Sequence, residues 1–531
     1  MTPTTETPGV QSGAAQARGT TAAPPPPPPG ALAGLPPPAA PVLPLVPEGI
    51  VEPLLSELSA SGHRGVRLPA CDVPVTPLAS TLPAWAIRPE RAALPEVSEP
   101  EVIRHFTRLS GLNHHLDKGF YPLGSCTMKH NPKINDELAF LPGMALAHPC
   151  TPDEGLQGAL ELMWNLERHL AAITGFDAVS LQPAAGAQGE FTGMLVVRAY
   201  HASRGDVARD TVLVPDSAHG TNPASVRAVG WKVVELKSKD GLLDLDALKA
   251  ALGPHVAAVM VTQPSTLGLF EPHIKEAADL IHAAGAQLYL DGANFNALVG
   301  LVQPGKIFDV MHLNLHKTFS TPHGGGGPGA GPVAVGAHLT PFLPGPRVMK
   351  NTDGTFRCER DLPQSVGRVH GWHGNFGVLV RAYVYIRALG PEGLTEVSTE
   401  AILNANYLMH RLKGAFELPF DRPCMHEFVL SGHGLRKYGV RTTDLAKRLL
   451  DFGVHAPTVY FPLIIEEAIM IEPTETETLR TLDLFADVML RIAGEAATDA
   501  SIVTGAPWTT PVSRLDEGRA ARELKLTWKA S

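Results

Sequence analysis

The sequence lacks several features that mark membrane, secreted and nucleic-acid-binding proteins. No run of about 18 apolar residues is free of charges and helix breakers, so no membrane-spanning segment is predicted. The net charge is −9 and no basic stripe is visible, which argues against a nucleic-acid surface. The five cysteines show neither paired metal spacing nor a disulfide framework, so we expect no metal site and a reduced, cytoplasmic protein. No convincing Gly-x-Gly-x-x-Gly fingerprint joins a strand to a helix, so no nicotinamide site is predicted.

The first 50 residues differ in composition from the rest. Fourteen of the 49 prolines fall there, and Arg18 is the only basic residue among them. Such a composition favours extended polyproline conformations and cannot build a core, so residues 1–50 are predicted to be a disordered tail. The tail also lacks the continuous apolar centre of a secretory signal.

From residue 150 onward, helical and strand patterns alternate. The predicted helices are 155–174, 189–203, 244–252 and 272–284, and the predicted strands between them are 211–214, 232–236, 256–261 and 287–290. This alternation predicts an α/β fold with a mostly parallel sheet. Beyond residue 380 the spacing loosens, with strands at 427–431 and 468–472, which suits a smaller C-terminal α+β domain. We therefore predict an N-terminal extension and arm at 51–150, a large domain at 151–380 and a small domain at 381–531.

A lysine between two histidines follows one of the apolar segments. Lys317 lies in the run 312–323, HLNLHKTFSTPH, directly after residues 309–313, which are predicted to be a buried strand. Desolvation disfavours an ammonium ion, so a sheltered lysine readily becomes a free amine that can attack a carbonyl. From this run alone, a lysine that pairs with an acid at a loop mouth is an equally good interpretation.

Asp291 favours the catalytic interpretation. It ends the predicted strand 286–290 and lies 26 residues before Lys317. On adjacent strands, the two side chains would meet at the carboxyl edge of the sheet, where α/β folds bind ligands. A lysine on the aldehyde and an acid facing the ring nitrogen are the two fixed contacts that pyridoxal phosphate needs. At about 4 Å and an effective dielectric of about 20, the acid stabilises a pyridinium by roughly 4 kcal/mol. Taken alone, an Asp-Gly pair after a strand is more often a turn.

Two further segments complete the predicted cofactor site. Small residues follow the strand 178–183 and begin a helix, where the backbone of Gly186, Ala187 and Gln188 is expected to bind a phosphate. His219 lies in a loop before another predicted helix and could stack on a cofactor ring. A lone loop histidine is more often a hydrogen-bonded surface group.

Several segments resemble one family in their order along the chain. They are 119–129 (GFYPLGSCTMK), 217–225 (SAHGTNPAS), 290–294 (LDGAN), 316–329 (HKTF to PHGGGGPG), 455–462 (HAPTVYFP) and 471–476 (IEPTET). They resemble the P-protein of the glycine cleavage system, a glycine dehydrogenase (decarboxylating), and more closely the second of two subunits into which some bacteria split it. The resemblance covers roughly residues 51–528.

The resemblance implies a fold and a reaction. The fold would be the fold type I, aspartate aminotransferase-like class, with pyridoxal phosphate bound to Lys317 and steadied by Asp291. Glycine would lose CO2, and its aminomethyl group would pass to the lipoyl arm of H-protein. The implied partners are the first subunit and lipoylated H-protein, in a heterotetramer with two copies of each subunit. By family position, the ring would pack between His219 and Ala293, with His316 or Thr318 helping to hold the phosphate.

Other interpretations stay open. A different fold type I decarboxylase or aminotransferase would share this fold but not the substrate pocket. A partner-binding subunit with a decayed cofactor site is the third hypothesis, which Lys317 and Asp291 disfavour. The polar residues of 121–129 either line the site or form a surface turn. Residues 323–332 are predicted to be either a mobile lid or a tight turn.

Overall fold

A seven-stranded sheet positions the predicted site. The computed structural model describes residues 51–90, 92–323, 329–524 and 526. The tail 1–50 and the glycines 324–327 therefore lie outside the described residues. The strand order is β1-β9-β8-β7-β6-β2-β3. The strands are β1 Ala178–Ser180, β2 Thr211–Pro215, β3 Lys232–Leu236, β6 Val256–Thr262, β7 Gln287–Gly292, β8 Val310–Leu313 and β9 Val333–Val335.

The sheet is mostly parallel, as predicted. Strands β3, β2, β6, β7 and β8 run parallel to their neighbours, whereas β9 is antiparallel to both β8 and β1. All seven residues of β6 are buried, because helices cover both faces of the sheet. Helices α6 and α7 pack on one face and helices α5, α8 and α9 on the other. They are α5 Gln157–Thr174, α6 Gly186–Ser203, α7 Thr221–Ala228, α8 Leu245–Ala251 and α9 Ile274–Ala283.

The register of the sheet brings the polar strand ends into one row. Thr262 pairs with Asp291 across β6 and β7, and Asp291 pairs with His312 across β7 and β8. The carboxyl ends of these parallel strands form one edge of the sheet, where ligands bind in such folds. Lys317 follows β8 in the single turn α10, Leu315–Thr318, rather than at the end of the strand itself.

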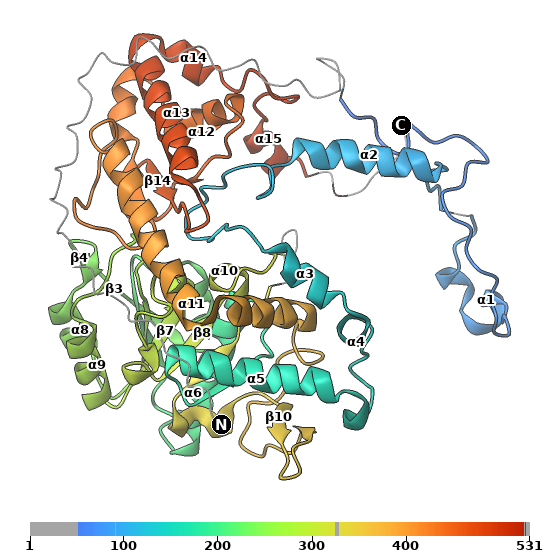
Figure 1. Cartoon of the computed structure of the whole chain (residues 1–531), viewed down its shortest axis with the longest axis horizontal. Coiled ribbons are helices and arrows are strands. Elements are labelled where there is room, and N and C mark those ends of the chain that lie inside the picture. Colours follow the sequence, from blue (N-terminus) through green and yellow to red (C-terminus); the bar gives the residue numbers. More distant parts are fainter. Residues whose placement is uncertain (1–50, 91, 324–328, 525, 527–531) are drawn as a thin grey trace, which may run out of the picture. The chain divides into compact units, whose positions relative to one another are not determined.

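A second core lies C-terminal to the sheet. The long helix α11, Phe376–Leu412, contributes Leu379 and Tyr385 to the first core and Leu408 and Leu412 to the second (Figure 1). Its helical backbone is interrupted at Gly390, directly before a proline. The other elements of the second core are α12 Thr442–Asp451, α13 Leu479–Thr498, α14 Ala500–Thr504 and the antiparallel strands β12 Phe428–Ser431 and β14 Ala468–Ile471. Strand β13 Thr458–Val459 pairs with β14 at the edge of this small sheet.

The remaining elements are mostly short. They are α1 Leu78–Thr81, α2 Glu99–Leu112, α3 Lys133–Ala139, α4 Pro142–Ala145, α15 Glu517–Arg522, β4 Ser238–Lys239, β5 Leu242–Leu243, β10 Arg347–Lys350 and β11 Phe356–Glu359. Among the described residues, no helix is both long and apolar enough to cross a membrane. The described residues form one contact unit, so the boundaries at 150 and 380 stay predictions.

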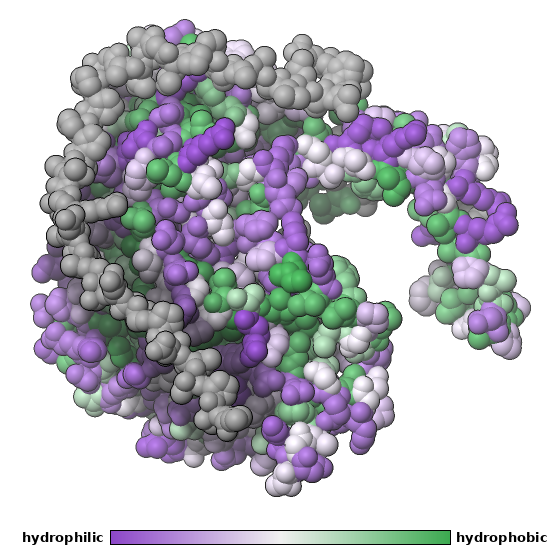
Figure 2. Space-filling view, in the orientation of Figure 1, coloured by the Kyte–Doolittle hydropathy of each residue, from purple (hydrophilic) through white to green (hydrophobic). Residues whose placement is uncertain are grey.

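Apolar side chains gather on the surface near α3 and α4 (Figure 2). Phe140 is 70% exposed and Leu146 is 80% exposed, and Ile134, Leu138 and Leu141 are also exposed. A contiguous apolar area of this kind often marks an interaction surface.

Gly268 provides a test of how closely the two cores approach each other. A Cβ at Gly268 (φ +73°) would lie 1.8 Å from the carbonyl oxygen of Glu427, whereas a Cβ at Gly205 (φ +77°) would meet nothing within 4 Å. Both Ala substitutions strain the left-handed backbone by about 1 kcal/mol, and Gly268→Ala should lower stability by roughly 2 kcal/mol more because the backbones must separate. Thermal unfolding of the two variants checks this. Equal melting temperatures would contradict the close approach.

Candidate active site

A pocket of about 220 Å³ opens at the carboxyl edge of β6, β7 and β8. Its lining consists of Ser125, Gly186, Ala187, Glu190, His219, Thr221, Thr262, Thr266, Asp291, Ala293, Asn294, His312, Asn314, His316 and Lys317. Every site residue predicted from the sequence is among them except Gln188 and Thr318.

The Gln188 side chain is engaged elsewhere, and Thr318 is buried next to Lys317. Gln188 accepts a hydrogen bond from the Ala184 N–H and donates one to the Val369 carbonyl, each at 2.6 Å, so its side chain closes the start of α6. Thr318 is fully buried, and its carbonyl accepts a hydrogen bond from Lys129 Nζ at 2.8 Å. For Gln188, only the backbone N–H remains a candidate phosphate contact, because helix-start N–H groups lack intrahelical partners.

Lys317 is held in place by a loop from far upstream. Its Nζ donates a hydrogen bond to the Ser125 carbonyl at 2.7 Å. Ser125 and Thr127 both have positive φ, at 64° and 48°, a conformation that is uncommon for residues other than glycine. The loop is therefore kept in an unfavourable backbone shape where it meets the lysine, and such strain is typical of functional sites.

Asp291 is a buried, ionised carboxylate on the floor of the pocket. It is 1% exposed, and it accepts hydrogen bonds from the Ala293 N–H at 2.9 Å and from the Asn222 amide at 3.1 Å. Burial by itself would raise the pKa of Asp291. His312, these two donors and Lys317 outweigh burial, and the net pKa lies below the ordinary value. Asp291 therefore carries its charge at neutral pH, as an acid that faces a pyridinium must.

His312 supports Asp291 from the neighbouring strand. Its Nε2 lies 3.4 Å from Asp291 Oδ1, and its Nδ1 forms a hydrogen bond with the Tyr289 hydroxyl at 2.9 Å. Burial lowers the pKa of His312, so the ring is neutral at physiological pH. Asp291 thus has a fixed neutral neighbour.

His219 lies on a loop between β2 and α7 and faces the pocket. Its Nδ1 lies 2.8 Å from Thr221 Oγ1, and its ring meets the edge of Phe461 at a centroid distance of 5.6 Å. His219 is partly exposed to solvent, but desolvation by the pocket wall lowers its pKa, so the ring is neutral. The Thr266 hydroxyl donates to the Ser217 carbonyl and fixes the start of this loop.

The start of α6 forms a cradle for an anion. A Cβ at Gly186 would lie 2.5 Å from Asn314 Oδ1, and a Cβ at Gly189 would lie 2.7 Å from the Gly331 carbonyl. Only glycine allows the helix start to approach these groups so closely, which brings its backbone N–H groups to the pocket. His316 accepts the Ala330 N–H at Nδ1, and burial lowers the pKa of His316 to about 3. Its Nε2–H is therefore a neutral donor on the same side.

Two buried acids fasten the loop that touches Lys317. Glu427 accepts the Ser125 N–H at 2.7 Å, and Glu472 accepts the Thr127 N–H at 2.7 Å and the Thr127 hydroxyl at 2.5 Å. Burial, and then the neighbouring Glu472, raise the pKa of Glu427 well above its ordinary value. The prediction that 121–129 lines the site holds for Ser125, which faces the pocket.

Lys129 ties the same loop to both cores. It is 1% exposed, and four acceptors surround the three N–H groups of its Nζ: Glu475 at 2.7 Å, Asn296 at 2.8 Å, the Thr318 carbonyl at 2.8 Å and the Tyr385 hydroxyl at 3.1 Å. These partners satisfy all of the donors of the ammonium group, so the charge is tolerated in the interior. In the same loop, burial raises the pKa of the Cys126 thiol to about 11, which keeps it protonated.

Among the described residues, one group could be considered for a metal ion. His426, Glu427 and Glu472 are buried, with ligand atoms within 4.8 Å of one another. Both carboxylates already accept backbone N–H groups of the loop, so their observed role is to hold that loop.

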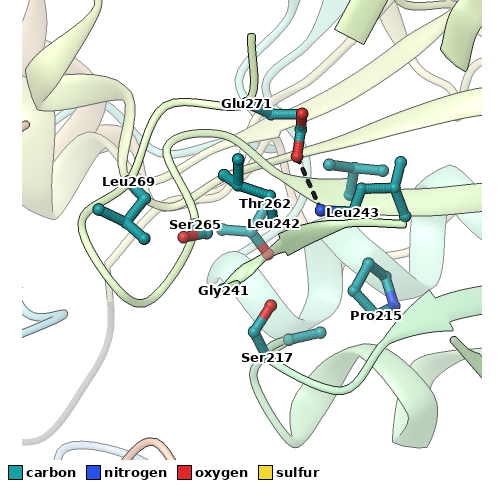
Figure 3. A pocket seen from close by; sticks show the side chains of 11 residues that line it. Pro215, Ser217, Gly241, Leu242, Leu243, Thr262, Ser265, Leu269 and Glu271 are labelled. Atoms are coloured by element: carbon teal, nitrogen blue, oxygen red, sulfur yellow. Dashed lines mark hydrogen bonds between the residues drawn. The ribbon is translucent and has the colours of Figure 1, made fainter. Parts of the chain in front are cut away.

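A second, smaller cavity lies behind the pocket and shares Thr262 with it (Figure 3). Its volume of about 20 Å³ is enough for one water molecule and too small for a cofactor. Ser217, Ser265 and Glu271 face it, and Glu271 accepts the Leu243 N–H at 2.8 Å.

Several pocket residues were missed in the sequence. Thr262 could have been found, because it directly follows the predicted strand 256–261 and so lies at the same sheet edge as Asp291. Glu190 and Thr221 gave no usable signal, because a glutamate inside a helix and a threonine at a helix start are usually solvated or capping residues.

This fold and this site define a fold type I, pyridoxal phosphate-dependent enzyme. A buried ionised acid, a lysine on the next strand-to-helix turn and a glycine-lined helix start fit that cofactor. Residues 78–356 match the family described as Glycine cleavage system P-protein, and residues 397–506 match Glycine dehydrogenase, C-terminal domain. The chain belongs to the glycine cleavage system P-protein family, which confirms the resemblance seen in the sequence.

Relatives and solved structures agree with this assignment. The chain is 55% identical to a probable glycine dehydrogenase (decarboxylating) subunit 2 of Bacillus velezensis, over 90% of this chain and 97% of the relative. It is 56% identical to a protein of the same name from Halalkalibacterium halodurans, over 90% of this chain and 98% of the relative. A crystal structure of an inhibitor-bound glycine decarboxylase (P-protein) matches with a TM-score of 0.66 at 22% identity, over 78% of this chain and 94% of that one. A cysteine desulfurase from Thermococcus onnurineus matches with a TM-score of 0.55 at 15% identity, over 71% of this chain and 95% of that one, and both likenesses show the fold alone.

The first prediction from this site concerns the covalent link. Lys317→Ala should abolish the absorption band of the lysine-bound aldehyde while leaving the unfolding temperature nearly unchanged, because Lys317 is only half-buried and belongs to neither core. Exposed Lys306→Ala serves as the matched control and should keep the band. A borohydride-reducible lysine adduct that persists in Lys317→Ala would overturn the assignment.

The second prediction concerns the loop. Glu472→Ala leaves the Thr127 N–H unpaired, and Glu467→Ala does the same to the Thr442 N–H, which Glu467 accepts at 2.8 Å. Each substitution should lower the free energy of unfolding by about 1–3 kcal/mol, because it leaves a buried N–H without an acceptor. Only Glu472→Ala should also slow the capture of pyridoxal phosphate by Lys317, which stopped-flow absorbance measures. Equal capture rates in the two variants would show that the loop does not position the lysine.

Proposed function

We propose that this protein catalyses the pyridoxal phosphate-dependent decarboxylation of glycine and transfers the aminomethyl group to the lipoyl arm of H-protein. The observation that carries the proposal is one pocket that joins Lys317 to Asp291, in a chain 55% identical over 90% of its length to a probable glycine dehydrogenase (decarboxylating) subunit 2. Other fold type I reactions remain the alternative, since a cysteine desulfurase has a similar fold.

The cofactor would accept the charge that develops in the reaction, and Asp291 would keep the cofactor ring protonated. When bound, pyridoxal phosphate supplies an aldehyde for an amine and an electron sink for the charge left when CO2 departs. The Asp291 carboxylate would hold the proton of the ring nitrogen. Its own hydrogen bonds to Ala293 and Asn222 fix its orientation, so it needs little rearrangement during the reaction.

Lys317 would act as both attachment point and proton carrier. Its Nζ is held by the Ser125 carbonyl, at the mouth of the pocket, and glycine would displace it from the cofactor. The freed amine would then move a proton at the substrate carbon. The loop anchored by Glu427 and Glu472 keeps this amine in reach throughout.

The other predicted residues would bind the cofactor. His219 and Ala293 would pack on opposite faces of the ring. The N–H groups of Gly186, Ala187 and Gln188, together with His316 Nε2–H, would hold the phosphate, as the positive end of an 18-residue helix favours an anion. The Thr318 hydroxyl, which is buried beside Lys317 and has no hydrogen-bond partner among the described residues, would be a further candidate to hold the phosphate.

We also propose that the protein works in the cytoplasm with a related first subunit, in a heterotetramer with two copies of each chain. The name "subunit 2" of the relatives supports a partner subunit. So does the number of exposed apolar residues in the N-terminal segment, where Leu68 is 80% exposed, Val75 76% and Trp85 88%. Exposing this many large apolar side chains to water is unfavourable, and such surfaces often mark a site where another chain binds.

The test is exchange of the glycine carboxyl group with labelled bicarbonate, in the presence of the first subunit and lipoylated H-protein. We expect exchange that requires glycine and H-protein and that Lys317→Ala abolishes, because only a reversible loss of CO2 returns label to glycine. Turnover of a larger amino acid without any exchange would contradict the proposal and favour another pyridoxal phosphate reaction.

A further inference from the structure

A buried glutamate in the pocket has no part in the function proposed above. Glu190 lies near the start of α6 and is 4% exposed. Its Oε1 accepts the Thr221 hydroxyl at 2.8 Å, and its Oε2 accepts the Ser225 hydroxyl at 3.1 Å. The cost of burying a carboxyl group here is offset by these two donors.

The same threonine hydroxyl also reaches His219. Thr221 Oγ1 lies 2.8 Å from His219 Nδ1, so one hydroxyl stands between a carboxyl group and an imidazole. A hydroxyl has a single proton and can donate to only one of these neighbours at a time. The Thr221 N–H lies 3.3 Å from the same nitrogen and favours the arrangement in which Nδ1 accepts.

This geometry allows two patterns for the Glu190–Thr221–His219 chain, and only the second also gives the Thr221 N–H an acceptor. If Glu190 is ionised, Thr221 donates to it and accepts from His219 Nδ1–H, so His219 Nε2 carries a lone pair. If Glu190 is protonated, it donates to Thr221, Thr221 donates to Nδ1, and the proton of His219 lies on Nε2. A proton that arrives at Nε2 can therefore be balanced by one that passes from Nδ1 through Thr221 to Glu190, and the imidazole stays neutral.

We propose that Glu190 is a positioning residue that, through Thr221, determines which ring nitrogen of His219 carries the proton, and so lets His219 Nε2 accept or donate a proton without charging the ring. Its use in turnover rests on the proposed function, whereas the control of the tautomer does not.

The electrostatic surroundings agree with this role. Burial, and then the charge of Asp291, raise the pKa of Glu190 to about 8, so the acid can change state near neutral pH. The other titratable groups that face it are Tyr289 on β7, Lys317 on α10 and His219 itself. Desolvation by the pocket wall lowers the pKa of His219 although part of the residue is exposed to solvent, so a relay that avoids the imidazolium form is favoured.

The experiment measures the reactivity of His219 in the cofactor-free protein. Diethyl pyrocarbonate acylates an imidazole nitrogen that carries a lone pair, and peptide mass spectrometry reports the rate at each histidine. Between pH 7 and 9, labelling of His219 relative to the exposed His255 should rise about tenfold, because a group that titrates at about 8 goes from roughly one-tenth to nine-tenths ionised.

Three variants separate the relay from simple packing. Glu190→Gln cannot titrate, and Thr221→Val removes the bridging hydroxyl. In both variants the labelling of His219 relative to His255 should therefore no longer rise between pH 7 and 9, whether its constant rate is high or low. Thr221→Ser keeps the hydroxyl and should restore the rise. Circular dichroism and thermal unfolding identify any variant that fails to fold. If Glu190→Gln or Thr221→Val does not fold, the labelling of the other variant tests the relay.

The outcomes separate this inference from the function. No rise in the wild type, or a rise that persists in folded Glu190→Gln or Thr221→Val, would overturn the relay even if bicarbonate exchange is normal. If the wild type shows the pH-dependent rise in His219 labelling and both variants lose it, the relay is supported, even if bicarbonate exchange is absent and the proposed function is wrong. Where exchange is present, its alkaline pH dependence should flatten in Glu190→Gln, while a merely structural role would lower the rate equally at every pH.

Discussion

The ionised carboxylate of Asp291 is the constraint on which the rest of the site depends. Moving a carboxylate into the interior costs several kcal/mol, so the surrounding chain must supply fixed donors. The Ala293 N–H, the Asn222 amide and His312 do this from the strand-end turn, from α7 and from β8. The register of the sheet and the position of α7 are thereby coupled to one charge, and the pocket is built around it.

A second constraint comes from outside the sheet. The amine of Lys317 is positioned by the Ser125 carbonyl, and Ser125 belongs to a strained loop that cannot keep its shape by itself. Glu427 and Glu472, from the second core, hold that loop through backbone N–H groups. The chemistry of the pocket therefore requires that both cores be folded and in contact, although the reacting groups lie on only one of them.

The parallel sheet and the main pocket residues could be predicted because they depend on local patterns. Lys317, Asp291 and His219 each follow an apolar strand or begin a helix, and strand ends share an edge of the sheet. Gln188 and Thr318 were also placed in the pocket by their position, but neither side chain lines it, and that of Gln188 bonds to the backbone of Ala184 and Val369 instead. The direction of the Gln188 side chain depends on a partner that comes near only in three dimensions, here Val369, and neighbours in the sequence do not reveal this.

The sequence by itself determined the α/β class, the cofactor, the family and the lysine–aspartate pair, because strand periodicity and motif order are local and survive without knowledge of contacts. Only the tertiary structure decided that Glu190, Thr221 and His219 form one hydrogen-bonded chain, and that acids some 300 residues downstream hold the loop over Lys317. Those functions arise from distances between segments far apart along the chain. A carboxyl group, a hydroxyl and an imidazole have no shared chemistry until folding places them within hydrogen-bond reach.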